Sequence, residues 1–351
     1  MISSSRDEDI LNPTLSTHSK ANIVSAVWNV TYRPDHFIQN PGFAKAYLRY
    51  YIEQCRIAAQ SKGLNTIIDS HADIVGIIKS FRDFTMPRKD IKNRILAQIP
   101  QPMPDDANDV VCEVIDLCVR LTFMIDVGKI QYGFVPGQRP LIWEDGSVKD
   151  FLQKHLGSAT FAPLRIVRVK LDRLFTARNL DRIAGLQIVW TDNLTDHLRL
   201  MVDDTRVAIF HHASFLEANR ESSAFPTGFV EETLQTLALL FPQYDKKTCN
   251  WFLEKQKKFG LDCKASTFGH LTTEERQIEN FVFWHDRLGI LKQVFDEAEP
   301  STIAQWWSDR RRRVQWYTFW VAAIVLTLTI LFGMIQCLEG ALQVYKAYYP
   351  S

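Results

Sequence analysis

The longest uncharged stretch of the chain runs from Val314 to Leu338 and is almost entirely apolar. At a rise of about 1.5 Å per residue, a helix of this length crosses the hydrocarbon core of a bilayer, which is about 30 Å thick. A buried core helix seldom stays apolar beyond about 14 residues, so the pattern predicts one transmembrane helix at 314–338. We expect a basic juxtamembrane helix at 301–313 before it and a short tail at 339–351 after it.

Upstream of this stretch, the apolar positions recur mainly with the period of an α-helix. They predict helices at 43–61, 74–81, 89–99, 109–127, 148–156, 176–184 and 229–241, and a last one from the capping box of Thr272 and Glu275 to Phe295. The polar N-terminus predicts a disordered tail at 1–21. We therefore expect a mainly α-helical protein with helical subdomains at 22–157 and 221–300.

Residues 158–220, between the two subdomains, predict a small α+β element. The pattern indicates a strand at 186–191, a helical turn at 193–197 and a hairpin with strands at 198–202 and 206–211. This order of helix, strand, helical turn and hairpin resembles a winged-helix element.

The residues flanking the apolar stretch predict its orientation. Arg310, Arg311, Arg312 and Arg313 precede it, and aromatic side chains lie at both of its ends. Basic residues collect on the cytosolic side of a membrane, so we expect the N-terminal domain to face the cytosol. The sequons at Asn29 and Asn193 would then carry no glycan.

The position of the apolar stretch near the C-terminus predicts how it reaches the membrane. Because 13 residues follow Leu338, we expect insertion after synthesis, as in tail-anchored proteins. The expected destination is the endoplasmic reticulum or another secretory membrane rather than the mitochondrial outer membrane.

Small residues recur every four positions within and just after the apolar stretch, at Thr329, Gly333, Cys337 and Ala341. Such a stripe allows a second helix to pack closely, which would form a homo-oligomer. The alternative is a lone helix that tolerates these residues.

Composition excludes several classes of function. The 41 basic and 40 acidic side chains balance, so no global field favours nucleic acid as a partner. The six cysteines are scattered, which favours a reducing compartment over a disulfide framework. The chain has no phosphate-binding loop, dinucleotide fingerprint, nucleophile elbow or zinc-protease motif, and we expect no cofactor.

The densest group of residues with catalytic potential contains Asp192, Asp196, His197 and His211. If 193–197 is helical, the two carboxylates lie one turn apart, and the hairpin could bring the histidines together as ligands for a metal ion. Residues of these types also serve as helix caps, turn formers and buried hydrogen-bond partners. Both interpretations stay open.

The C-terminal third resembles a group of uncharacterised membrane proteins of filamentous fungi, and the likeness extends upstream to about residue 110. The residues that carry it are Phe295-Asp296-Glu297-Ala298-Glu299-Pro300, Gln305-Trp306-Trp307, Asp309-Arg310-Arg311, Gln315-Trp316-Tyr317-Thr318-Phe319-Trp320-Val321-Ala322, Leu328-Thr329, Phe332-Gly333, Gln336, Glu339-Gly340-Ala341-Leu342-Gln343-Val344-Tyr345-Lys346, Trp190-Thr191-Asp192-Asn193-Leu194 and Glu232-Thr233-Leu234. This resemblance implies a fungal origin and a C-terminal anchor, and no activity.

A more distant likeness to CorA-type magnesium transporters lies in a soluble domain that leads by a long helix into the membrane. That family has two transmembrane helices and a Gly-Met-Asn motif, whereas here Gly333-Met334 is followed by Ile335.

Taken together, the sequence favours a single-pass membrane protein that presents an interaction or scaffolding domain to a cytosolic protein partner. The alternatives are a subunit of a CorA-like divalent-cation transporter and a membrane-tethered metal-dependent enzyme. No sequence motif favours an enzyme.

Overall fold

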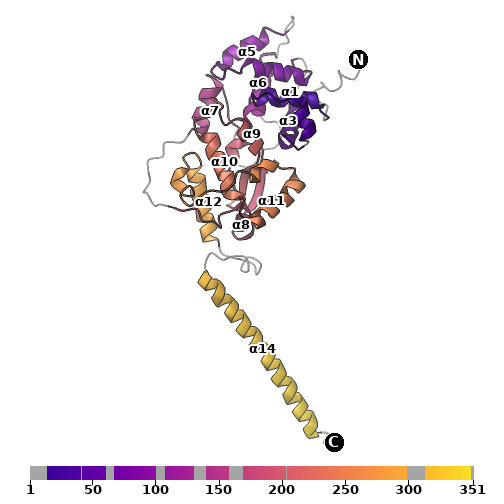
Figure 1. Cartoon of the computed structure of the whole chain (residues 1–351), viewed down its shortest axis with the longest axis vertical. Coiled ribbons are helices and arrows are strands. Elements are labelled where there is room, and N and C mark those ends of the chain that lie inside the picture. The colour runs from indigo at the N-terminus through magenta and orange to yellow at the C-terminus, as the bar shows by residue number, and fades with distance from the viewer. Residues whose placement is uncertain are drawn as a thin grey trace.

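Helices dominate the computed structural model, which describes residues 14–40, 42–60, 67–99, 107–129, 140–157, 169–202, 204–298 and 313–348. A small sheet lies in the middle of the chain, and one long helix follows at the C-terminus (Figure 1). This confirms the predicted fold class. The first helices are α1 (Thr17–Val27), α2 (Pro34–Gln39), α3 (Lys45–Ala58), α4 (His71–Ser80), α5 (Arg88–Leu96), α6 (Ala107–Phe123) and α7 (Val148–Leu156).

The second half of the chain contains shorter helices, 3-10 turns and the sheet. The helices are α8 (Ala177–Arg182), α9 (Ala213–Ala218), α10 (Phe229–Leu240), α11 (Lys246–Phe259), α12 (His285–Glu297) and α14 (Arg313–Tyr348), and the turns are η2 (Leu194–Asp196), η3 (Cys263–Ser266) and η4 (Ile278–Asn280).

Helix α6 is the central element of the first half. Its apolar side chains are buried around most of its circumference, as its sequence predicts, and α3, α4 and α5 contact it. The last carbonyls of a helix lack partners within the helix. Here the Tyr47 hydroxyl donates to the Leu121 carbonyl at 2.9 Å, and the Tyr50 hydroxyl donates at 3.0 Å to the Arg120 carbonyl, which also accepts the Met124 backbone N–H. Two tyrosines of α3 thus complete the C-terminal end of α6.

The sheet has the order β1-β3-β2. β2 (Leu200–Met201) and β3 (Arg206–Phe210) pair antiparallel, which is the predicted hairpin, and β1 (Gln187–Thr191) pairs with β3 in parallel. The register places Thr191 beside Phe210, so β1 and β3 end at the same edge.

Four helices, α1, α2, α9 and α11, lie where the sequence pattern did not predict them. α1 begins at Thr17, inside the predicted tail 1–21, because the Ser16 hydroxyl accepts the Ser19 N–H and apolar side chains of α1 are buried. α11 has only three buried side chains, at Thr248, Trp251 and Phe252, and its five lysines leave little apolar periodicity in the sequence.

The predicted last helix begins later than its capping box. Thr272 and Glu275 do bond to each other, yet η4 and an extended segment follow them, and α12 starts only at His285. The buried Glu232 carboxylate of α10 explains this start, since it accepts the backbone N–H groups of Val282, Phe283 and Trp284, each at 2.8 Å. A carboxylate at a helix N-terminus also opposes the positive end of the helix dipole.

Helix α14 contains one segment that is apolar and long enough to cross a membrane, Tyr317–Tyr345. The most apolar part of this segment is 0% buried, which contradicts the alternative of a buried core helix. The helix continues beyond Leu338 to Tyr348, so most of the predicted tail at 339–351 is helical as well.

The four arginines before this apolar segment are described only in part. α14 begins at Arg313, which places this residue in a helix, whereas Arg310, Arg311 and Arg312 lie outside the described residues. The rest of the predicted juxtamembrane helix at 301–313 lies outside them too. The role of the four arginines in the orientation of the protein therefore stays a prediction from their charge.

Replacing Glu232 with Gln tests the cap of α12. We expect a loss of about 2 kcal/mol in the free energy of unfolding. The amide NH₂ of Gln would replace one carboxylate oxygen, so at least one of the three backbone N–H groups would lose its acceptor. Chemical denaturation of the full chain in detergent micelles measures this. Glu231→Gln, at an exposed position on the same turn, should change stability by less than about 0.5 kcal/mol. Equal stability of the two variants would contradict this role of Glu232.

Candidate functional site

Three polar side chains meet where β1 and β3 end. Asp192 directly follows β1, and His211 and His212 directly follow β3. The Asp192 Oδ1 atom lies 3.4 Å from His211 Nε2 and 2.6 Å from His212 Nε2. The parallel pairing of β1 and β3 produces this cluster, because it brings the C-terminal ends of both strands to the same edge of the sheet.

The hydrogen bonds of His211 define its neutral tautomer. Its Nδ1 atom accepts the backbone N–H of Asp262 at 3.3 Å, so the proton of the neutral ring lies on Nε2, facing Asp192. The Asp262 carboxylate in turn accepts the Ser214 backbone N–H at 2.6 Å and the Ser214 hydroxyl at 2.9 Å. Ser214, at the start of α9, thus fixes the position of Asp262, and the backbone of Asp262 in turn orients the His211 ring.

His212 stacks on His211, with ring centroids 4.1 Å apart. Its Nε2 atom bonds to Asp192, whereas its buried Nδ1 atom has no hydrogen-bond partner among the residues that the structure describes. The Tyr50 ring lies 6.2 Å away, so α3 closes this side of the cluster.

The three groups differ in exposure. The Asp192 side chain is 46% exposed, whereas those of His211 and His212 are 2% and 1% exposed. Burial acts to raise the pKa of Asp192, but the hydrogen bonds from the two histidines outweigh it and hold this pKa well below its usual range. Burial also lowers the pKa of His211 to about 4. At neutral pH the cluster therefore presents an ionised Asp192 carboxylate to solvent, in contact with a neutral His211 ring.

Among the residues that the structure describes, these three could hold a metal ion, since one ligand atom from each lies within 4.8 Å of the others. A histidine that binds a metal normally donates its other ring N–H to an acceptor. His211 Nδ1 instead receives an N–H, and His212 Nδ1 meets no acceptor among the described residues. The hydrogen bonds thus fit two imidazole donors on one carboxylate better than they fit a metal centre.

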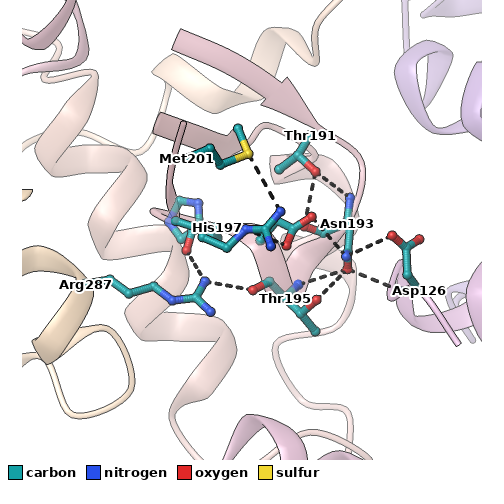
Figure 2. A network of polar contacts seen from close by, with 9 residues as sticks. Asp126, Thr191, Asn193, Thr195, His197, Met201 and Arg287 are labelled. Carbon is teal, nitrogen blue, oxygen red and sulfur yellow. Dashed lines mark hydrogen bonds and ion pairs between the residues drawn. The ribbon is translucent and has the colours of Figure 1, made fainter. Parts of the chain in front are cut away.

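Asn193, next to Asp192, ties this edge of the sheet to the end of α6. Its Nδ2 group donates to the carboxylates of Asp126 at 3.0 Å and Asp196 at 3.2 Å, and its Oδ1 accepts the backbone N–H groups of Asp126 and Thr195 (Figure 2). Arg287 of α12 closes the other side by donating to the carbonyls of Thr195 and His197.

The structure separates the four residues that the sequence groups together. Asp192 and His211 meet, but Asp196 pairs with Arg199 at 3.2 Å and bonds to Asn193. Both ring nitrogens of the fully buried His197 are occupied, because Nδ1 accepts the Phe210 N–H and Nε2 bonds to the Thr236 hydroxyl at 2.6 Å. Asp196 and His197 thus belong to hydrogen-bond networks other than that of Asp192.

Sequence reasoning missed His212, which strand alternation would have placed on the face opposite His211. The chain leaves the strand at this point, because His212 is the N-cap of α9. Two adjacent histidines after a buried strand were the only signal in the sequence.

Asp192→Asn tests the charge of the cluster. We expect a loss of about 1 kcal/mol in unfolding free energy, a modest value for charge-assisted hydrogen bonds because the carboxylate is half exposed. Denaturation at pH 7 measures it, with the exposed Asp204→Asn as the matched control. A variant as stable as the wild type would show that the histidines do not need the carboxylate charge.

The burial of His197 leads us to expect that the folded protein loses stability in acid. Burial lowers its pKa from 6.5 to about 3, so between these values the unfolded chain binds a proton that the folded chain does not. Stability should therefore fall as the pH falls through this window, by up to about 1.4 kcal/mol per pH unit from this residue. Unfolding free energies measured from pH 7 to pH 4 should show a shallower slope for His197→Gln than for the wild type. Identical slopes would contradict this assignment.

Comparison with protein-family models, with curated proteins and with solved structures gave no match. The resemblances to fungal membrane proteins, to CorA-type transporters and to a winged helix therefore stay predictions. The interpretation of the cluster of Asp192, His211 and His212 depends on its geometry alone.

Proposed function

We propose that this chain is a single-pass membrane protein, anchored by α14, whose helical domain serves as an interaction or scaffolding domain in the cytosol. The exposed apolar surface of α14 carries the proposal. Leu326, Phe332 and Leu338 are 62%, 62% and 65% exposed, and most of the other large apolar side chains of the segment are exposed as well, with Phe319 and Trp320 partly exposed. Soluble monomers rarely present a contiguous apolar surface of this extent to water.

The length of the segment supports a full crossing. Its 29 residues extend over about 44 Å as a helix, which exceeds the hydrocarbon thickness of about 30 Å and allows the helix to tilt. The hydroxyls of Thr327 and Thr329 donate to the carbonyls of Ala323 and Val325, so neither needs a partner outside the helix.

The flanking charges support a cytosolic domain. Four consecutive arginines precede the segment, whereas Lys346 is the one basic residue after it. The excess of positive charge at Arg310, Arg311, Arg312 and Arg313 favours the domain side as cytosolic.

Self-association of the anchor is a separate part of the proposal. The small residues Thr329, Gly333, Cys337 and Ala341 would let a second copy of α14 pack closely. This contact between two copies stays a prediction.

The exposed, ionised carboxylate of Asp192 on the domain surface supports an interaction role. A carboxylate that two histidines keep ionised, and that is half exposed, can bind an ammonium or guanidinium group of a partner. Proximity labelling from the N-terminus of the full chain, compared with the same labelling enzyme fused to the anchor alone, tests this role. Identical sets of labelled neighbours would contradict it.

Alkaline carbonate extraction of membranes that contain the full chain tests the anchor. We expect the wild type to stay in the membrane pellet and Leu326→Lys/Ile330→Lys to be released, because a lysine at the membrane centre costs about 2.5 to 3.5 kcal/mol. Ile142→Lys changes a side chain of the soluble domain that is 69% exposed, and it should stay in the pellet. Release of the wild type would contradict the anchor.

The sequon at Asn29 tests the orientation. Asn29 is exposed, whereas Asn193 is buried and bonded, so Asn29 is the informative position. We expect no glycan there, and a glycan on Asn29 would place the domain in the lumen.

A further inference from the structure

Helix α11 presents a basic face to solvent. Its 14 residues contain five lysines and one acidic residue, the exposed Glu254, which lies on the same side of the helix as four of the lysines, so the net charge of this face is positive. Four of the lysines, at 246, 247, 257 and 258, are exposed, and at about 100° per residue they fall within about a third of the helix circumference. No ion pair joins any of these four lysines to another described residue.

The neighbouring helix α8 extends this basic face. α8 contacts α11 and contributes the exposed Arg182, and the exposed Arg173 lies shortly before α8, with its guanidinium 5.9 Å from the Tyr244 ring. Two nearby carboxylates already have hydrogen-bond donors, since Asp181 accepts the Trp251 indole N–H and Asp245 caps α11. We name Arg173, Arg182, Lys246, Lys247, Lys257 and Lys258 the basic surface.

Apolar side chains lie among these charges. Tyr244, Leu253 and Phe259 are 47%, 48% and 41% exposed, and Lys258 Nζ lies 5.2 Å from the centre of the Phe259 ring. Lysines interleaved with exposed aromatic and leucine side chains are typical of helices that lie at the interface of an anionic membrane.

The basic surface lies close to the point where the chain leaves the domain for the anchor. Phe295, in the last turns of α12, packs against Phe175, which lies just before α8, with ring centroids 5.6 Å apart. Figure 1 shows α8, α11 and α12 together at the end of the domain from which the chain continues to α14. The fifteen residues between α12 and α14 can extend to at most about 50 Å.

We propose that the basic surface of α8 and α11 binds the anionic headgroups of the membrane that holds α14. This inference rests on the proposed anchoring, which keeps the surface near the bilayer at a high effective concentration. Basic residues near an anionic leaflet are attracted to it, and the attraction fades within a Debye length of about 10 Å at 0.1 M salt. The membrane is a better fit than nucleic acid, because the tether supplies it and the exposed apolar side chains suit its interface.

Lysine labelling of the full chain in vesicles tests the proposal. The protein is reconstituted in vesicles of phosphatidylcholine alone or with phosphatidylserine, and a membrane-impermeant amine reagent is read by mass spectrometry. We expect Lys257 and Lys258 to react at least about threefold more slowly in the anionic vesicles, and this difference to vanish near 1 M salt, where the Debye length is about 3 Å. The exposed Lys79 of α4 and Lys89 of α5 should react equally in both.

A charge-reversed variant, Lys257→Glu/Lys258→Glu, should lose the slower labelling of Lys246 and Lys247 in anionic vesicles, whereas Lys89→Glu should keep it. Equal labelling of the wild type in both vesicle types would overturn the proposal. So would slower labelling that appears only when transfer RNA is added to neutral vesicles, since that result would assign the surface to nucleic acid. Failure of the protein to float with the vesicles would instead contradict the anchoring, so the two failures can be distinguished.

Discussion

Five residues of β1 lie parallel to five of β3, and most of what is specific to this domain depends on that pairing. A parallel pair needs a connection that returns the chain to its starting edge, and here η2 and β2 provide it. Both strands therefore deliver their following residues to the same place. Asp192 meets His211 and His212 there, and Asn193 reaches the end of α6.

The same edge joins the two halves of the chain. The Leu194 backbone N–H donates to the Met124 carbonyl at 2.7 Å, directly after α6, and Arg287 reaches across from α12. The polar groups at this edge thus connect elements that are far apart in the sequence. A substitution here should act on packing between the halves as well as on the local cluster.

Local patterns carried much of this fold. Helix α6 was predictable because apolar residues surround it, and α7 because Ser147 caps it and four apolar side chains form one face. The hairpin of β2 and β3 was predictable from its turn. Helix α11 was not, since three buried side chains among five lysines give little periodic signal.

Contacts between distant residues set the features that the sequence did not reveal. The start of α12 depends on Glu232, about fifty residues earlier, and a capping box nearer in sequence suggested an earlier start. The grouping of Asp192 with His212 rather than with Asp196 depends on the parallel pairing, which no local pattern encodes. The transmembrane prediction needed no such contact, because length and apolarity alone define it.

The carboxylate of Glu232 also affects how the domain would bear mechanical load. It accepts the backbone N–H groups of Val282 to Trp284, at the end of α12 that is farther along the chain from α14. A pull on α14 would reach the C-terminal end of α12 first and would have to peel Phe295, Leu291 and Leu288 out of the core one turn at a time. The contacts of α12 would therefore break in sequence from its C-terminal end, and the hydrogen bonds from Glu232 of α10, just before the N-terminal end of α12, would bear the force last.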